Sequence, residues 1–395
     1  MRNEKVLLLI LAVVQFTHIV DFMIIMPLGA QLMDLLGITP KQFSWIVGAY
    51  AISACISSLV SAMFIDRFDR KKALLMAYVG FTVGTLACAL ANSFEFFLLA
   101  RSVAGAFGGI LGALVLAVVG DVIPFERRSS AMGLVMTAFS AASVAGVPAG
   151  IYLAAEYSWH MPFVVIGAVS MLSALIILLL FPSLTSHLES KTDRPGPWQT
   201  LTQIFKNSNQ TGALFFSIIL MLGHFSIIPF IAPYMQLNVG FDDHQVAYIY
   251  TVGGILTVFL LPYFGRLADR FGNPQVFTIA SFFALFSIFA VTNIPHVSMF
   301  IALCVTSSFF VVASGRNVPA TTMVTSVVHP RNRGSFMSVR ASFNQMALAI
   351  GSFMAGMIVT KNPDGTLANY QYVGYIAIAM SILAVVVAWR LRPVG

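Results

Sequence analysis

The chain has 395 residues, of which 58% are hydrophobic and only 9% are charged, and its mean hydropathy is +0.87. Because soluble domains carry about 25% charged residues, this composition excludes an ordinary soluble protein and predicts a membrane protein. The net charge of +7 would be compatible with nucleic-acid binding in a soluble protein, so its meaning depends on where the basic residues lie.

Twelve apolar segments are long enough to cross a bilayer as helices, which takes roughly 20 residues. They comprise residues 5–35, 42–65, 73–92, 95–122, 130–154, 160–182, 212–237, 245–265, 275–293, 297–327, 335–360 and 370–391. The first begins like a signal peptide, but its apolar stretch runs well beyond about 15 residues and no small-residue cleavage site ends it. No segment has the alternating pattern of a transmembrane barrel. We therefore predict an all-helical membrane protein with twelve spans.

The basic residues gather on one side of the predicted membrane. Seventeen of the 22 Lys and Arg residues lie at the two termini, in the central connection, or in the connections after spans two, four, eight and ten. The positive-inside rule places that side, and with it both termini, in the cytoplasm. The positive charge therefore reflects topology, and we expect a monomer in the cytoplasmic (inner) cell membrane that contacts the lipid bilayer and no nucleic acid.

The long hydrophilic connection at residues 183–210 divides the chain into an N-terminal bundle of six spans, 1–182, and a C-terminal bundle of six spans, 211–395. Within this connection, Trp198, Leu201 and Phe205 recur at helical spacing. The spacing predicts a surface helix at the level of the lipid headgroups, and a regulatory site is the alternative.

The two halves repeat one another at an offset of 203 residues, without a gap over some fifty positions. At this offset DFMII at 21–25 meets HFSII at 224–228, Gly37 meets Gly240, Gln42 meets Gln245, and DRF at 66–68 meets DRF at 269–271. Because six spans separate the copies, both run the same way through the membrane. A parallel repeat of this kind is typical of carriers and predicts a site near the midplane between the halves.

Four segments resemble motifs of the major facilitator superfamily. GRLADRFGN at 265–273 is similar to its loop signature G-x-L-A-D-R-x-G-R-K, and AMFIDRFDRKK at 62–72 is a looser copy in which Ala62 and Asp69 replace glycines. LLARSVAG at 98–105 resembles the fourth-span motif R-x-x-x-G. AGVPAG at 145–150 resembles the glycine–proline motif of the antiporters, except that Val147 separates the glycine from the proline.

This resemblance covers the whole chain and is specific, because the two loop copies stand in register. It implies the major facilitator fold, with two pseudo-symmetric bundles of six helices, and a secondary transporter that resembles the twelve-span drug:proton antiporter branch. The altered glycine–proline motif leaves the direction of transport open.

The charged loops predict a gate at the cytoplasmic ends of the spans. We expect Arg67, Arg70 and Lys71 to pair with Asp66, with Asp121 and with carbonyls at helix ends, where a cation is favoured. Such contacts would hold the cytoplasmic side shut and break when the halves rock. The second copy would contribute Gly265, Asp269 and Arg270. The alternative is that these charges only fix the topology.

Asp21 and Arg101 are charged residues inside apolar spans. Asp21 lies roughly 24 Å from the cytoplasmic start of span one, and Arg101 lies roughly 11 Å from the outer end of span four. In a hydrocarbon core about 30 Å thick these depths nearly coincide. Because spans one and four are neighbours in the family's architecture, we expect Arg101 to pair with Asp21. Protonation of Asp21 would release Arg101, so the pair is a predicted proton-coupling switch, and a permanent structural ion pair is the alternative.

A second set of polar residues within the spans is predicted to contact substrate. His18 lies one turn before Asp21, and His224 is the counterpart of Asp21 in the repeat. The set comprises His18, His224, Arg316, Asn317, Arg340, Asn344 and Gln345. The alternatives are packed neutral histidines and, for Arg340, a side chain that reaches back to the cytoplasmic face. The basic residues favour an anionic, zwitterionic or neutral polar substrate over a lipophilic cation.

These features predict proton-coupled efflux of a small amphipathic drug or metabolite by alternating access. The alternative is uptake or flipping of an anionic or zwitterionic amphipathic metabolite, lysolipid, sugar or siderophore. H-E-x-x-H, G-x-S-x-G and P-loop patterns are missing from the sequence, and the three cysteines lie in apolar runs. We therefore expect no enzyme activity, no cofactor and no metal. The two loop copies disfavour a channel or a receptor.

Overall fold

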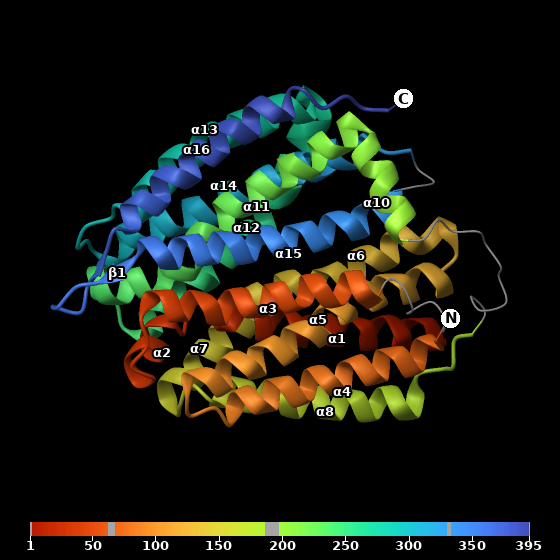
Figure 1. The fold of residues 1–395 in the computed structure, drawn as a ribbon, viewed down its shortest axis with the longest axis horizontal. Coiled ribbons are helices and arrows are strands. Elements are labelled where there is room, and N and C mark those ends of the chain that lie inside the picture. The colour runs from red at the N-terminus through yellow and green to blue at the C-terminus, as the bar shows by residue number, and fades with distance from the viewer. Residues whose placement is uncertain (1, 62–67, 186–196, 330–332, 395) are drawn as a thin grey trace. The chain divides into compact units, whose positions relative to one another are not determined.

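The computed structural model describes residues 2–61, 68–185, 197–329 and 333–394. Within these ranges, twelve helices are long and apolar enough to cross a membrane, which confirms the predicted number of spans (Figure 1). The chain divides into two compact units: unit 1 comprises Met1–Ile25 and Ala49–Pro197, and unit 2 comprises Met26–Gly48 and Trp198–Gly395. The bundles expected at 1–182 and 211–395, with a linker at 183–210, remain a prediction.

Unit 1 is built from five of the predicted spans and the second part of a sixth. Its helices are α1 (Arg2–Ile24), α4 (Arg70–Ala89), α5 (Phe94–Val122), α6 (Phe125–Ala141), α7 (Val147–Glu156) and α8 (Met161–Leu180), with a π-helical turn η2 (Ala142–Gly146) between α6 and α7. Helix α3 (Pro40–Ser61) begins in unit 2 and ends in unit 1. Helix α4 packs between α5 and α8, and α1 contacts α5, α6 and α8, so α1 lies inside the unit.

Unit 2 holds the other spans and two short helices. Its elements are α2 (Gly29–Leu35), α10 (Pro197–Lys206), α11 (Ser208–Tyr234), the π-helical turn η3 (Met235–Val239), α12 (Asp243–Phe271), α13 (Asn273–Thr292), α14 (Met299–Ser326), α15 (Arg333–Ile358) and α16 (Tyr370–Ala388). Helix α11 packs against α15 and α16, and α14 packs against α12 and α13. Segment Met26–Gly48 is fastened here, because Gln31 Nε2 donates to Asp243 Oδ2 at 2.6 Å.

The connection between α15 and α16 contains a small antiparallel hairpin that the sequence did not predict. Strands β1 (Thr360–Lys361) and β2 (Leu367–Ala368) pair with Thr360 opposite Ala368. The turn Asn362-Pro-Asp-Gly365 closes it, and Gly365 has a φ of 88°. Positive φ costs glycine nothing, so this sequence favours a tight turn.

The repeat found in the sequence recurs in the local structure. Gly37 and Gly240, which correspond at the 203-residue offset, both have positive φ, 60° and 88°. The amide of Thr39 donates to Gln42 Oε1 at 2.9 Å, and the amide of Asp242, its counterpart, donates to Gln245 Oε1 at 3.1 Å. The same capping interaction therefore starts α3 and α12.

Two predicted boundaries were wrong. The first span was expected to run to residue 35, but α1 ends at Ile24 and α2 follows after a turn. Pro27 accounts for the break, because proline has no N–H to donate and disfavours helix in the residue before it. The eighth span was expected to end at residue 265, but α12 continues to Phe271, and Gly272 ends it with a φ of 91°. The second charged motif is therefore helical and does not form a loop.

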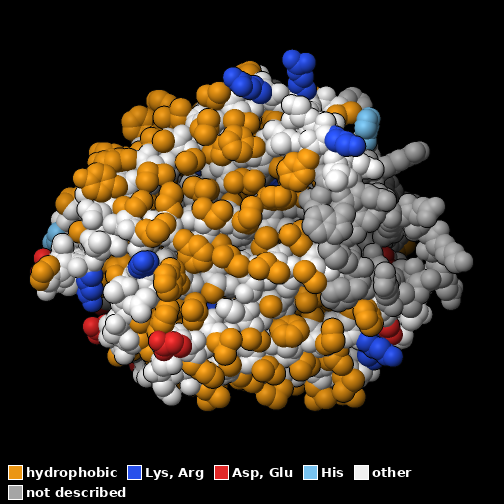
Figure 2. Space-filling view, viewed as in Figure 1, with side chains coloured by type: hydrophobic (Ala, Val, Ile, Leu, Met, Phe, Trp, Pro, Cys, Tyr) orange, Lys and Arg blue, Asp and Glu red, His pale blue; other side chains and the backbone are white. Residues whose placement is uncertain are grey.

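Large apolar side chains cover much of the outer surface. In Figure 2 hydrophobic side chains spread across the face in view, and most charged side chains lie toward its edges. On α13, Phe282, Phe283 and Phe286 are each more than half exposed. Such a surface would cause aggregation in water, and it suits contact with lipid. The expected helix in the central connection is α10, whose Ile204 is buried in the core of unit 2.

Candidate functional site

The predicted partner of Asp21 is its observed partner. Arg101 Nη1 on α5 lies 2.8 Å from Asp21 Oδ2 on α1, and both side chains are completely buried. The same nitrogen donates to the backbone carbonyl of Asp21 at 3.2 Å. Thr85 on α4 donates to the other carboxylate oxygen, Oδ1, at 3.0 Å. Three helices therefore hold one carboxylate, and the ion pair that depth matching predicted is confirmed as a contact.

The remaining surface of Arg101 meets an aromatic ring and has spare hydrogen-bond donors. Its guanidinium carbon lies 4.4 Å from the ring centroid of Tyr50, a cation–π contact. Among the described residues, Nε and Nη2 of Arg101 are buried without a hydrogen-bond partner, and so is the Tyr50 hydroxyl. Arg101 therefore uses only one of its three nitrogens on Asp21 and keeps donors for another acceptor.

Glycines on α5 explain why the ring of Tyr50 can reach Arg101. A Cβ atom at Gly105, one turn after Arg101, would collide with the backbone carbonyl of Tyr50, and one at Gly109 would collide with that of Ala54. Helices α3 and α5 can therefore approach closely only because these residues lack side chains. The motif R-x-x-x-G thus has a structural reason, since its arginine carries the charge and its glycine admits the covering helix.

The segment that resembles the antiporter motif packs on the same region of α1. A Cβ atom at Gly146 would collide with Val20, and one at Gly150 would collide with Ile24, so these glycines lie on either side of Asp21 along α1. The helix is π-helical over Ala142–Gly146, just before Pro148. Such turns are frequent at functional sites.

His18 lies beside this ion pair, one turn before Asp21 on α1. Its ring centroid is 6.2 Å from that of Tyr50 and 5.9 Å from that of Phe81. Neither ring nitrogen has a hydrogen-bond partner among the described residues, and both are buried. Oε1 of Gln15, one turn earlier on α1, is also buried without a hydrogen-bond partner among the described residues. Unit 1 therefore has a buried polar patch along α1 whose hydrogen-bonding capacity is only partly used.

In unit 2 the predicted basic residues are buried among neutral groups. Arg316 on α14 is 1% exposed, and its Nη1 donates to Ser381 Oγ on α16 at 2.9 Å. Arg340 on α15 is 7% exposed, and its Nε donates to Ser217 Oγ on α11 at 3.0 Å. Arg340 is therefore buried within unit 2, and the alternative that it reaches back toward the cytoplasmic face stays a prediction.

The other residues predicted to contact substrate lie in separate surroundings. His224 on α11 stacks on Phe309 with centroids 5.9 Å apart, and its Nδ1 is buried without a partner among the described residues. Asn344 Oδ1 is buried in the same way, whereas Asn317 Nδ2 donates to the carbonyl of Ala313 within its own helix. Gln345 lies on α15, one residue after Asn344, and is partly buried.

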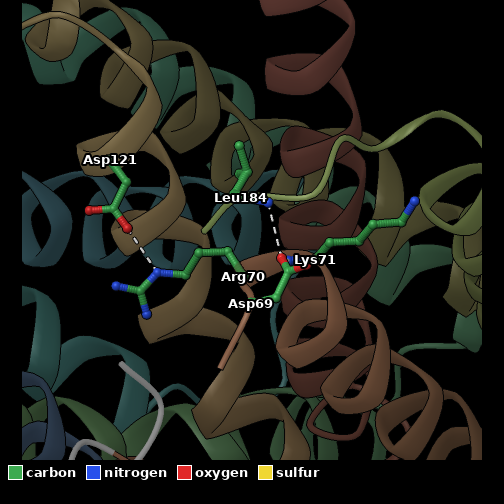
Figure 3. A network of polar contacts seen from close by, with 5 residues as sticks. All are labelled: Asp69, Arg70, Lys71, Asp121 and Leu184. Atoms are coloured by element: carbon green, nitrogen blue, oxygen red, sulfur yellow. Dashed lines mark hydrogen bonds and ion pairs between the residues drawn. The ribbon is translucent and has the colours of Figure 1, made fainter. Parts of the chain in front are cut away.

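The end of unit 1 at which α4 begins and α5 ends carries the expected contact between Arg70 and Asp121 (Figure 3). Arg70 Nε at the start of α4 lies 2.8 Å from Asp121 Oδ2 at the end of α5, and the arginine side chain is only 2% exposed. Asp66 and Arg67 lie outside the described residues. The gating role of all four residues remains a prediction.

Asp69 is a residue of this end whose role the sequence did not reveal. It caps α4, because its Oδ1 accepts from the amide of Lys71 at 2.9 Å, and the same oxygen accepts from the amide of Leu184 at 3.0 Å (Figure 3). Its Oδ2 accepts from Ser183 Oγ at 2.5 Å. Burial alone would raise the pKa of Asp69, but these hydrogen bonds and the charge of Lys72 together lower it below its usual value. Asp69 replaces a glycine of the family motif, and this departure was the available signal.

The second charged motif has no matching ion pair in the described part of the chain. Asp269 and Arg270 are exposed on the last turns of α12, and the Arg270 guanidinium lies 5.2 Å from the ring centroid of Phe271. Gly265 is on the same helix, and a Cβ atom there would make an ordinary contact with Val318 Cγ1 at 3.9 Å. The described residues also contain no group of three His, Cys, Asp or Glu side chains that could hold a metal ion.

Comparison with known proteins places this geometry in a family context. The sequence profile of the Major Facilitator Superfamily matches residues 11–223 and 213–395. Multidrug resistance protein 2 of Bacillus subtilis (strain 168) is 22% identical over 366 residues, which cover 91% of this chain and 90% of the relative.

Two solved structures share the fold. A bacterial homologue of the human lysosomal transporter Spinster, in an inward-facing and occupied conformation, matches with a TM-score of 0.81 at 16% identity, and the match covers 99% of this chain and 97% of the other. A D-xylose–proton symporter matches with a TM-score of 0.77 at 15% identity, and the match covers 98% and 97% of the two chains.

Proposed function

Since this chain belongs to the Major Facilitator Superfamily, and is therefore a secondary transporter that works by alternating access, we propose that it exports a small amphipathic drug or metabolite in exchange for protons. We place it in the cytoplasmic (inner) membrane with both termini in the cytoplasm. The ion pair between Asp21 and Arg101 carries the proposal.

Asp21 is suited to couple a proton to a conformational change. Among the described residues, it is the one carboxylate whose side chain is completely buried. A buried carboxylate beside an arginine stays ionised only while that pairing persists. When Asp21 takes up a proton, Arg101 loses its counter-charge, and its two unpartnered nitrogens can hold a different acceptor. The two protonation states would then favour two arrangements of α1 and α5.

Export is the direction that the relatives favour. Multidrug resistance protein 2 matches this chain over nearly its full length. The turn at Ala142–Gly146 and the glycines around it pack on α1 beside Asp21, in the segment that resembles the antiporter motif. Uptake or flipping of an anionic or zwitterionic metabolite is the second candidate, and the buried arginines of unit 2 favour it.

In this proposal the charged residues at the cytoplasmic ends of the spans act as a gate. Arg70 and Asp121 would fasten α4 to α5 in one state of the cycle. Asp66 and Arg67 would complete this network, and Gly265, Asp269 and Arg270 would act at the equivalent end of α12.

The test uses inside-out vesicles that contain the native protein, with and without an imposed pH gradient. The compounds are ethidium, as an amphipathic cation, methyl decanoate, as a neutral compound, and decanoate and decyl phosphate, as anions. We expect gradient-driven uptake of at least one compound, which Asp21→Asn abolishes while exchange without a gradient continues. Asp34→Asn, an equivalent change at an exposed residue of α2, should behave like the native protein. Gradient-driven transport that persists in Asp21→Asn would exclude Asp21 as the coupling residue.

A further inference from the structure

Unit 2 buries two positive charges and has no buried negative charge to match them. Its acidic residues are five aspartates: Asp34, Asp242, Asp243, Asp269 and Asp364. All five are described, and they lie on α2, at the two ends of α12 and in the hairpin turn. None of them forms an ion pair with Arg316 or Arg340, which are 1% and 7% exposed.

The partners of the two arginines are uncharged. Ser381 Oγ accepts from Arg316 and itself donates to the carbonyl of Ala377 at 2.9 Å, so it is a neutral partner. Arg340 donates to hydroxyl groups of Ser217 and Thr321, at 3.0 and 3.3 Å, and approaches the sulfur of Met337. These groups orient the guanidinium groups without neutralising them.

Arg316 also has unused hydrogen-bonding capacity beside a second unpartnered group. Its Nε is buried and has no partner among the described residues. His224 on α11 stacks on Phe309, which lies two turns before Arg316 on α14, and its Nδ1 is likewise buried and unpartnered among the described residues. A cation with a free N–H and a neighbouring free ring nitrogen form a recognition site for an acceptor group that the chain does not supply.

A buried positive charge is energetically unfavourable unless an anionic group pairs with it. A single arginine at the centre of a membrane helix costs about 3 kcal/mol on insertion scales, and such residues in membrane proteins usually face a functional site. The described residues offer Arg316 no counter-ion, so an oxyanion of a bound molecule would complete the site. Guanidinium groups prefer planar or multidentate oxyanions, above all carboxylates and phosphates.

We propose that Arg316, with His224 beside it, binds the anionic group of the transported molecule, so that the substrate is an amphipathic carboxylate or phosphate. This inference rests on the proposed transport function and specifies its substrate class. Arg340 extends the positive region toward the cytoplasmic end of the unit. It contacts Thr321, which follows Arg316 by five residues on α14 and so lies about 7.5 Å further along that helix.

The experiment measures binding to the purified full-length protein in nanodiscs of zwitterionic phosphatidylcholine. The probes are decanoate and decyl phosphate, with methyl decanoate as the uncharged match and decylamine as the cationic one. We expect the native protein to bind the two anions at least about tenfold more tightly than the ester or the amine. Arg316→Gln should remove this preference and leave the weak binding of the ester unchanged, which also shows that the variant is folded.

Two further variants separate the role of the guanidinium group at Arg316 from the effect of charge alone. Arg316→Lys retains the charge but loses the planar fork of donors. It should therefore still bind the two anions more tightly than the ester, but its binding of the carboxylate decanoate should lose most of that advantage. Arg333→Gln replaces an exposed arginine at the start of α15 and should leave the preference intact. The proposal is overturned if the native protein does not distinguish decanoate from its ester, or if both Arg316 variants bind like the native protein.

A lipid headgroup and a free amphiphile carry the same anionic chemistry, and a repeat in nanodiscs that contain phosphatidylglycerol separates them. If decanoate binding weakens there, and Arg316→Gln is insensitive to the change, the site accepts the headgroup of an anionic lipid. If the anionic lipid has no effect, the site takes a free amphipathic anion. Binding needs no proton gradient, so a negative result in this binding test does not contradict proton coupling at Asp21. A negative result in the coupling test likewise does not contradict anion binding at Arg316.

Discussion

In unit 1 the buried arginines Arg101 and Arg70 each lie 2.8 Å from an aspartate, whereas in unit 2 Arg316 and Arg340 are buried against hydroxyl groups. The repeat sharpens the contrast. The 203-residue offset places His224 where unit 1 has Asp21, so unit 2 has no carboxylate at that position. The two units share a fold and a local capping interaction, but their buried arginines have different partners. We infer that unit 1 holds the site that titrates and unit 2 the site that recognises a charge from outside.

Removal of the buried arginine should have very different consequences for stability in the two units. Arg101→Leu leaves Asp21 buried and uncompensated, so it should lower the free energy of unfolding by about 3–5 kcal/mol. Arg316→Leu leaves only Ser381, which still donates to Ala377, so the free energy of unfolding should stay unchanged or rise by about 1 kcal/mol. Thermal unfolding of both variants in one detergent measures the difference. Equal losses would mean that Arg316 has a structural counter-ion and would remove the contrast between the units.

A smaller effect is expected from crowding the ion pair without changing its charges. Gly105→Ala places a methyl group against the backbone of Tyr50 and should force α3 away from α5, at a cost of about 1–3 kcal/mol. Gly112→Ala on the same helix meets open space and should be neutral or slightly stabilising. Unfolding of the two variants gives the comparison, and equal stability would show that the close approach of α3 is not needed to cover Arg101.

The pair of Arg70 and Asp121 is less buried than the pair of Asp21 and Arg101 and should contribute less to stability. The side chain of Asp121 is 19% exposed, so Asp121→Asn should lower the free energy of unfolding by about 1–2 kcal/mol. If the pair also acts as a gate, this variant should bind decanoate normally and transport it more slowly. Glu95→Gln, at the other end of α5, is the matched control. Parallel losses of binding and transport would argue against a gate.

The smallest effect concerns Asp69 and depends on pH. Because the pKa of Asp69 is lower in the folded protein, its hydrogen bonds stabilise the fold above its unfolded pKa of about 3.9 and this contribution is lost as the pH falls through the folded value. Asp69→Asn can still cap α4 but cannot ionise. The native protein should therefore be more stable than this variant near neutral pH, and the two should converge once the pH falls below the pKa of Asp69 in the folded protein. A constant difference in melting temperature over this range would show that the charge of Asp69 does not contribute.

The spans, the repeat and the buried ion pair were accessible from the sequence because each rests on regular geometry. A helix has a fixed rise, so residue numbers convert to depths, and two opposite charges at one depth can be matched. The same reasoning could not find Thr85 or Tyr50, because a neutral residue within an apolar span has no signal that distinguishes a hydrogen bond from ordinary packing. Both residues hold the pair in place.

The errors have local causes. Pro27 was available as a signal for the end of α1, but the apolar composition on both sides of it concealed the break. The second charged motif was read as a loop because of its family resemblance, although no helix-breaking residue occurs between Gly265 and Phe271. In unit 2 the lack of a counter-ion for Arg316 could not be established from the sequence, since it depends on where all five aspartates lie in space.

Infrared difference spectroscopy of the carboxyl band, recorded on the purified protein between about pH 9 and about pH 5, tests most directly whether Asp21 takes up a proton. We expect a band from a buried protonated carboxyl to appear within this range in the native protein, to be missing from Asp21→Asn, and to persist in Asp34→Asn. A native spectrum that matches that of Asp21→Asn throughout would mean that Asp21 stays ionised beside Arg101. The pair would then be a permanent structural contact and not the coupling site.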